Sequence, residues 1–386
     1  RNTHSLLSQF SNFKSSLRLM NILHYFDKTD SMTAQYIAML SRVSSHETAM
    51  FFATDCQEAL KILQMADINI LHIHGCWRTS TARLFTKART KAIRLVVSPH
   101  GQLEPWFFNQ RYWKEKLPKA LLFQHRIISQ AYAIVVEGAM EEECLRKLNW
   151  NKRIIIVRNP IITCSITAEE TLRQLTQIYR RIMDSNTIEL MQPETLSTLR
   201  LAIKAGITQD IRWLNLPASH TPPHLDEEGW RQIRCYAQQE QIEQLIDRGL
   251  RILQCDCPHF DEMKSHPFFP DHYQPSKGIE ETIGMSFTSE NKRLIETFRL
   301  LHRLISRNKL TVCHLCELDK ELREHDCNEE KLTESLEELR LLKSGRRLMQ
   351  VMVEETGFDE GFMPFPPLND RVTRNIERQI KNHLKI

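Results

Sequence analysis

The chain has 386 residues, more than a single hydrophobic core usually serves, so we expect two structural units. Its composition, 41% hydrophobic and 26% charged, is typical of a soluble globular protein and excludes a disordered chain. The net charge of +4 is too balanced to indicate nucleic acid, and no apolar run approaches the roughly 20 residues that span a bilayer.

The first part of the chain alternates between strand and helix patterns. Residues 1–19 contain Ser, Arg and Lys but no acid, and we expect a weakly ordered extension there. Short apolar runs then predict six strands, over 20–26, 47–54, 68–75, 93–101, 131–137 and 153–160. Segments with helical spacing lie between them, over 33–45, 56–66, 81–90, 116–130 and 141–148. This alternation predicts a Rossmann-like α/β domain over residues 20–162, with a parallel sheet covered on both faces.

Residues 163–386 have a different pattern. Long polar helical stretches dominate, and only eight glycines and almost no β-branched runs occur, so we predict a mainly α-helical region without a second nucleotide-binding sheet. Loops rich in Pro and His interrupt it at 219–224 and 265–275. Residues 290–350 also suggest a winged helix-turn-helix, but the acidic start of its reading helix argues against DNA, and we expect no nucleic-acid partner.

Two predicted strands end in the same dipeptide. His74-Gly75 and His100-Gly101 each follow an apolar run, and ligands of parallel sheets bind outside the carboxyl ends of the strands. Glycine lets a ligand approach the backbone, histidine exchanges hydrogen bonds near neutral pH, and the nearby Trp77 and Trp106 supply flat apolar surface. Such a cleft suits a sugar. In the alternative interpretation, the glycines only form tight turns and the histidines only cap local backbone.

The run HIHGCW (72–77), then SPHGQLEPW (98–106), a Lys-rich helix and EEECLRKLNWNKRIIIVRNPI (141–161) resembles the N-terminal domain of glycosyltransferase family 4. These are enzymes of the two-domain GT-B fold, and the likeness is to bacterial members that serve surface-polysaccharide synthesis. It covers residues 20–162. The resemblance implies transfer of a sugar from a nucleotide-sugar, the donor substrate, to a glycan or lipid-linked acceptor. We expect no cofactor and no metal ion.

The resemblance also implies roles for individual residues. His100 would face the cleft near the transferred sugar as the catalytic residue. Gly101 would lie beside it, and Glu141 and Asn159 match residues of the family pattern. Together with the strand-end pattern, this predicts the substrate-binding residues His74, Gly75, Trp77, Gly101, Glu104, Trp106, Glu141 and Asn159.

The chain departs from the family pattern in several places. The loop after the first strand, 27–35, has no glycine, Glu137 replaces the usual threonine, and Asn149 replaces the usual glycine. The family's donor-binding second domain is not recognisable in residues 163–386. Either a partner transferase supplies the donor site, or the chain is a non-catalytic relative that binds a glycan or a partner.

Residues 110–126 combine basic and aromatic side chains. A basic amphipathic helix suits an anionic membrane surface, where a lipid-linked acceptor would lie. The alternative is a solvated helix with a buried aromatic stripe. We expect a cytoplasmic protein, and the membrane interpretation places it at the inner face of the cell membrane.

Ten cysteines are scattered mostly singly through the chain, which favours reduced thiols in the cytosol. Two clusters have some ligand-like spacing and raise the alternative of structural zinc: Cys255, Cys257, His259, Cys313, Cys316, His325 and Cys327. Because Cys313 and Cys316 share one face of a predicted helix, a core role is favoured over a metal site.

Overall fold

The computed structural model describes residues 19–163, 165–214, 216, 223–258, 260, 277–284 and 290–382. The chain forms two units, Arg1–Ile182 and Met183–Ile386. The expected N-terminal extension lies outside the described residues except for residue 19. The predicted loop 265–275, most of the loop 219–224, and His259 also lie outside them.

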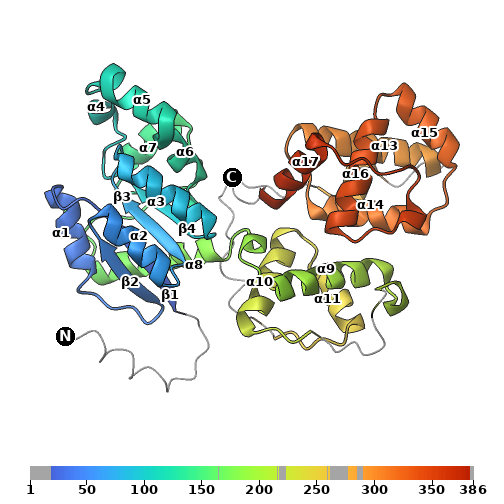
Figure 1. Cartoon of the computed structure of the whole chain (residues 1–386), viewed down its shortest axis with the longest axis horizontal. Helices are drawn as coiled ribbons and strands as arrows, with labels where there is room; N and C mark the ends of the chain where they lie inside the picture. Colours follow the sequence, from blue (N-terminus) through green and yellow to red (C-terminus); the bar gives the residue numbers. More distant parts are fainter. Residues whose placement is uncertain are drawn as a thin grey trace. The chain divides into compact units, whose positions relative to one another are not determined.

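The first unit is built on a six-stranded sheet in which every strand pairs in parallel. The strand order is β2-β1-β3-β4-β5-β6 (Figure 1). The strands are β1 Met20–Tyr25, β2 Thr48–Ala53, β3 Ile70–His74, β4 Arg94–Ser98, β5 Ala133–Val136 and β6 Ile154–Ile156. Each strand falls within a run predicted from the sequence, and the Rossmann-like α/β fold is confirmed.

Helices connect the strands of this unit. They are α1 Ser31–Leu40, α2 Cys56–Met65, α3 Thr79–Thr90, α4 Pro105–Phe108, α5 Leu117–Lys119, α6 His125–Gln130, α7 Ala139–Leu148 and α8 Ala168–Met183. The single helix predicted over 116–130 is instead interrupted by a π-helical turn, Ala120–Gln124, and a second such turn, Tyr112–Lys116, precedes it. Pro118 has no N–H to donate to the preceding turn, which accounts for the irregular hydrogen bonding there.

The two faces of the sheet differ in chemistry because side chains alternate along each strand. Leu23, Leu71, Ile73 and Val97 belong to one hydrophobic cluster with residues of α2, α3 and α6. The opposite face carries His24, His72, His74 and Ser98, all of them buried. Helices α1 and α8 reach this histidine face through Tyr36 and Tyr179.

The first unit extends to residue 182, twenty residues beyond the predicted domain end at 162. The added segment is α8, whose sequence looks polar overall. Its buried apolar side chains nevertheless follow helical spacing: Leu172, Leu175, Ile178, Tyr179 and Ile182. The Tyr179 hydroxyl lies 2.7 Å from Nδ1 of His72 on β3, so α8 belongs to the fold of the sheet.

The second unit is helical, as predicted, and its described residues contain no strand. Its helices are α9 Pro193–Thr208, α10 Glu227–Gln239, α11 Glu243–Ile252, α12 Ile279–Ile283, α13 Glu290–Ser306, α14 Val312–Glu324, α15 Glu329–Glu338, α16 Leu342–Glu355 and α17 Arg371–Asn382. Helices α9 and α11 approach very closely: a Cβ added at Gly206 would overlap the carbonyl oxygen of Leu245, and one at Gly249 that of Ala202.

A buried carboxylate links three parts of this unit. Asp319 on α14 accepts hydrogen bonds from Arg323 at 2.5 Å and from the Thr356 hydroxyl at 2.6 Å. Arg323 also binds Asp359, which in turn pairs with Lys204 on α9 at 2.8 Å. Because each buried charge has a partner, the network fixes α9 against α14 without leaving an unpaired ion.

Across the described residues of both units, we find no helix whose length and hydropathy together would allow it to cross a membrane.

Candidate functional site

The candidate site lies at the carboxyl edge of the sheet, where the strand order changes direction. β1 is flanked by β2 and β3, so the connections leaving β1 and β3 run toward opposite ends of the sheet. Crevices at such switch points are the usual ligand sites of open parallel sheets. Both predicted dipeptides, His74-Gly75 after β3 and His100-Gly101 after β4, lie at this edge.

Left-handed backbone conformations mark both strand ends. Gly75 has a φ of +88° and Gly101 a φ of +74°, conformations that glycine adopts without a steric penalty. A Cβ at Gly75 would also lie 3.2 Å from the Gln102 amide, whereas one at Gly101 would meet only the Glu104 side chain, at 4.0 Å. His100 has a φ of +50°, a strained conformation for a residue with a side chain. The contacts of its side chain must therefore hold the loop in place.

Those contacts form a chain of three imidazoles that ends on a carboxylate. His100 Nδ1 lies 2.8 Å from Glu137 Oε1, and His100 Nε2 lies 2.9 Å from His74 Nδ1. His74 Nε2 in turn lies 2.9 Å from His24 Nδ1. Both ring nitrogens of His100 are thus engaged within the protein, and only 9% of its side chain is exposed.

Electrostatics assigns the tautomers along this chain. Burial opposes ionisation of Glu137, but the hydrogen bonds from His100 and Asn159 and the electrostatic attraction of His100 together outweigh it, and the pKa of Glu137 lies below its usual value. Burial lowers the pKa of His24 to about 3 and that of His74 well below its usual value, so both rings are neutral. With Glu137 anionic and His100 donating to it from Nδ1, a lone pair at His100 Nε2 would accept from His74 Nδ1–H, and a lone pair at His74 Nε2 would accept from His24 Nδ1–H.

The predicted residues Glu141 and Asn159 join the same cluster. Glu141 Oε1 accepts from the backbone N–H of Gly101 at 2.7 Å, and its Oε2 accepts from that of Glu137 at 3.2 Å. Asn159 donates from Nδ2 to Glu137 Oε1 at 2.8 Å. Burial raises the pKa of Glu141 despite these bonds. Both side chains are nearly inaccessible, so they position the loop that carries His100.

The structure separates the two predicted tryptophans. Trp77 is buried: its backbone N–H donates to Gln124 Oε1 at 2.8 Å and its indole N–H to the Gln102 carbonyl at 3.0 Å. It therefore supports the loops and does not offer a flat surface to a ligand. Trp106 is 63% exposed, and its indole N–H donates to Glu104 at 2.5 Å. Of the two, only Trp106 is available for stacking.

Sequence reasoning missed four members of this cluster: His24, His72, Glu137 and Tyr179. His72 and His74 stand two residues apart in LHIH, an alternation that places both on one face of a strand. This signal was visible in the sequence. The part played by His24 and Tyr179 follows from the pairing of β1 with β3 and the return of α8, which no local pattern reveals.

The cysteines do not gather in the same way. Every cysteine among the described residues is a free thiol. Burial raises the pKa of Cys313 to about 12 and that of Cys316 well above its usual value, so both stay protonated on α14. In the part of the chain that the structure describes, three potential metal ligands converge elsewhere, at His24, His72 and His74.

Comparison with known proteins finds no matching family model, no matching curated protein and no matching solved structure. Function is therefore inferred from the geometry of this site.

Proposed function

We propose that the protein is a glycosyltransferase-like enzyme. It transfers a sugar from a nucleotide-sugar donor to a glycan or lipid-linked acceptor in bacterial surface-polysaccharide synthesis. One observation carries the proposal: the two glycine turns and the His100–Glu137 pair converge at the carboxyl edge of a Rossmann-like sheet, beside its switch point. The resemblance of the surrounding motifs to family 4 supplies the reaction class.

The chemistry centres on the His100–Glu137 pair. A carboxylate that accepts from Nδ1–H orients an imidazole and stabilises it when it gains a proton at Nε2. His100 Nε2 is occupied by His74 at 2.9 Å, so it must turn away from His74 before it can accept a proton from an acceptor hydroxyl. In this mechanism, a substrate that binds beside Gly101 causes the His100 ring to turn away from His74.

The donor nucleotide needs a second binding surface in this proposal. The described residues of the second unit form helices and no sheet of the kind that holds a nucleotide-sugar in two-domain transferases. We therefore assign donor binding to a partner transferase, with the present chain contributing the acceptor side.

The segment around residues 110–126 supports a membrane-bound acceptor. Four large apolar side chains on it and just before it are 63–79% exposed: Trp106, Trp113, Leu121 and Leu122. Arg111, Lys114 and Arg126 are exposed in the same segment. Exposed apolar side chains combined with positive charge suit the headgroup region of an anionic membrane. In this proposal the protein is cytoplasmic and peripheral to the inner face of the cell membrane.

A second candidate function is a non-catalytic subunit that binds a glycan or a partner transferase. The engagement of both His100 nitrogens inside the protein favours it, because that arrangement serves the loop without any substrate.

Transfer from a labelled nucleotide-sugar distinguishes these two functions. The full chain is titrated with a panel of nucleotide-sugars and assayed for transfer, alone and with the transferases of its own cell envelope. Transfer that depends on this chain and on His100 supports the enzyme. Binding of acceptor glycan without transfer in any pairing supports the non-catalytic subunit.

A further inference from the structure

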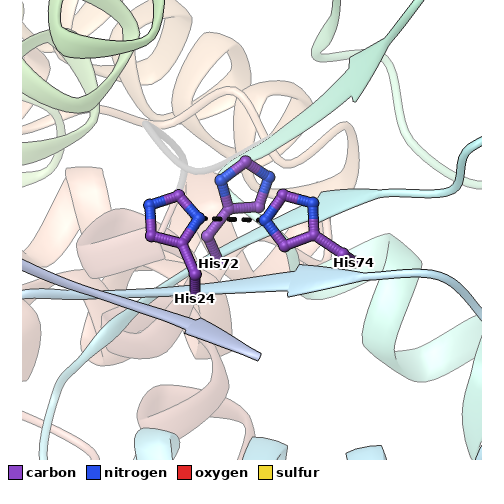
Figure 2. A group of neighbouring side chains, drawn as sticks. All are labelled: His24, His72 and His74. Atoms are coloured by element: carbon purple, nitrogen blue, oxygen red, sulfur yellow. Dashed lines mark hydrogen bonds between the residues drawn. The ribbon is translucent and has the colours of Figure 1, made fainter. Parts of the chain in front are cut away.

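Three imidazoles converge in the interior of the first unit. His24 on β1 pairs in register with His72 on β3, and His74 follows two residues later on the same face. Figure 2 shows the rings turned toward one another, with the hydrogen bond between His24 and His74 crossing in front of His72. One nitrogen from each ring lies within 4.8 Å of the other two, and the three side chains are 0–3% exposed.

Burying such a cluster costs folding free energy, so its presence calls for a functional explanation. Burying polar rings on a sheet face loses their hydration, and apolar residues would fill the same space without that loss. A proton relay does not account for the cluster. His24 Nε2 is buried without a hydrogen-bond partner in the described part of the chain, so a relay starting at His100 would have no outlet at its inner end.

We propose that His24, His72 and His74 bind one divalent transition-metal ion, Zn²⁺ or an ion with similar ligand preferences. Neutral imidazole is the preferred ligand of Zn²⁺, Co²⁺, Ni²⁺ and Cu²⁺, whereas Mg²⁺ and Ca²⁺ require oxygen. The site does not depend on the proposed sugar transfer.

The three ligand nitrogens lie within 4.8 Å of one another, so the rings must move to bring all three to one ion. Zinc–nitrogen bonds of about 2.0–2.1 Å in a tetrahedral site place two nitrogens roughly 3.3 Å apart. His24 Nδ1 and His74 Nε2 are now 2.9 Å apart, so the ion would replace their hydrogen bond after a small separation of the rings. One of these two nitrogens carries the proton of that hydrogen bond, and it presents a lone pair once the proton moves to the other nitrogen of the same ring, so no proton need be lost.

The surroundings match those of histidine metal sites. A ligating histidine usually donates its second N–H to a fixed acceptor, often a carboxylate, which sets the tautomer. His74 Nδ1 reaches Glu137 through His100, and His72 has hydroxyls at both nitrogens, Ser98 at 2.8 Å and Tyr179 at 2.7 Å. Whichever hydroxyl the ion displaces, the other remains to hold the ring.

A bound ion would join β1 to β3 at the switch point and fix His74 in the tautomer that donates to His100. It would therefore stabilise the first unit and set the orientation of the His100 ring.

The test uses untagged full-length protein, freed of metal with a chelator and titrated with Co²⁺ and then Zn²⁺. We expect one equivalent per chain and visible Co²⁺ absorption bands that Zn²⁺ removes. His24→Asn and His72→Asn should weaken binding by more than roughly 100-fold, since changes outside the ligand set alone cost about 10- to 100-fold. Glu137→Gln, which keeps all three ligands, should fall within that smaller range.

Two control variants define the site. His46→Asn changes an exposed histidine of the same unit, and the Cys313→Ser/Cys316→Ser pair removes the alternative ligands on α14. Both should bind as the wild type does. The proposal is overturned if the wild type binds no Co²⁺, if the His24 and His72 variants bind equally well, or if the cysteine pair abolishes binding.

A measurement on the wild type covers the case in which the histidine variants do not fold. Co²⁺ shifts the resonances of the exchangeable N–H protons of its imidazole ligands, so three shifted imidazole N–H signals are expected in the proton NMR spectrum. Their absence from Co²⁺-loaded protein would exclude the site.

Discussion

At the scale of single residues, His100 combines a functional position with a structural one. Its imidazole connects His74 to Glu137, and its backbone is held at a φ of +50°. Replacing it by alanine removes the imidazole and keeps the strained backbone, whereas glycine removes both. The two substitutions therefore separate the contribution of the imidazole from the free-energy cost of the left-handed backbone.

We expect His100→Ala and His100→Gly to reduce sugar transfer equally, by about 100-fold or more, because both delete the proton acceptor. Each should also lower the unfolding free energy by roughly 1–3 kcal/mol, because Glu137 and His74 lose a buried partner. The glycine variant should be the more stable of the two by about 1 kcal/mol, since left-handed backbone costs a β-carbon roughly that much. Denaturant unfolding and a transfer assay on the same preparations measure both effects. Full activity with reduced stability would assign His100 a structural role alone.

Gly101 offers a complementary change. A Cβ there would meet only the Glu104 side chain, so Gly101→Val should disturb the unit mainly through its φ of +74°, by about 1–2 kcal/mol, while the added side chain covers the approach to His100. Acceptor binding should therefore fall far more than stability does. Calorimetric titration with acceptor glycan, beside thermal unfolding, compares the two, and unchanged acceptor affinity would place the ligand elsewhere.

The buried histidines also predict how stability depends on pH. Burial holds the pKa of His24 at about 3, and those of His72 and His74 well below the ordinary 6.5 to which all three return on unfolding. Between those pKa values the unfolded chain binds more protons than the folded protein. The stability that the neutral rings contribute is therefore fully present above pH 6.5, and the unfolding free energy falls as the pH is lowered below that value. Each ring contributes about 1.4 kcal/mol per pH unit, or roughly 4 kcal/mol per unit together.

Urea unfolding of metal-free protein at several pH values between 7 and 5 measures this slope. In His24→Leu the slope should be about one third smaller, because one of the three titrating rings is gone. A slope that does not change with this substitution would mean that the rings are not neutral in the folded protein. The depressed pKa of Glu137 acts in the same direction at lower pH, since its stabilisation is lost as the pH falls below the ordinary carboxylate range.

At the scale of elements, the strands were predictable and the polar cluster was only partly so. Runs such as INILHIHG reveal both a buried strand and the histidines at its end, because strand periodicity is a local property. The contacts of His24 and Tyr179 depend on which strands pair and where α8 returns, which are tertiary outcomes. Trp77 shows the reverse error: its position after Gly75 suggested a binding surface, but packing against the 102–124 segment buries it.

The segment from α4 to α6 carries a prediction of its own. Leu121 and Leu122 are 79% and 78% exposed beside exposed basic residues, a combination that favours anionic lipid. Leu121→Ser/Leu122→Ser should reduce binding to vesicles containing phosphatidylglycerol by about 10-fold or more, since each buried leucine contributes roughly 1.5–3 kcal/mol. Met65→Ser, at a position 88% exposed on α2, is the matched control and should bind normally. Equal binding by all three proteins in a vesicle co-sedimentation assay would refute the membrane surface.

At the scale of the whole molecule, the two units have separate interiors. The buried residues of the hydrophobic cluster on the sheet fall between residues 23 and 154. Those of the cluster in the helical unit fall between residues 199 and 380. A unit with its own core is able to fold by itself. The two criteria place the boundary between the units differently. The change in composition near residue 162 assigns α8 to the helical unit, whereas the structural division at residue 182 assigns it to the first unit.

Two fragments of the first unit test that boundary. Residues 19–182 should fold cooperatively and keep the circular dichroism expected of a parallel α/β unit. Residues 19–162 lack α8, whose buried apolar side chains contribute roughly 1.5–3 kcal/mol each, a sum comparable with a typical total stability of about 5–15 kcal/mol. Without Tyr179, His72 also loses the hydroxyl at its Nδ1. The shorter fragment should therefore aggregate or unfold without a cooperative transition in thermal and urea unfolding. If instead it proves as stable as the longer one, α8 is not part of the fold of the sheet.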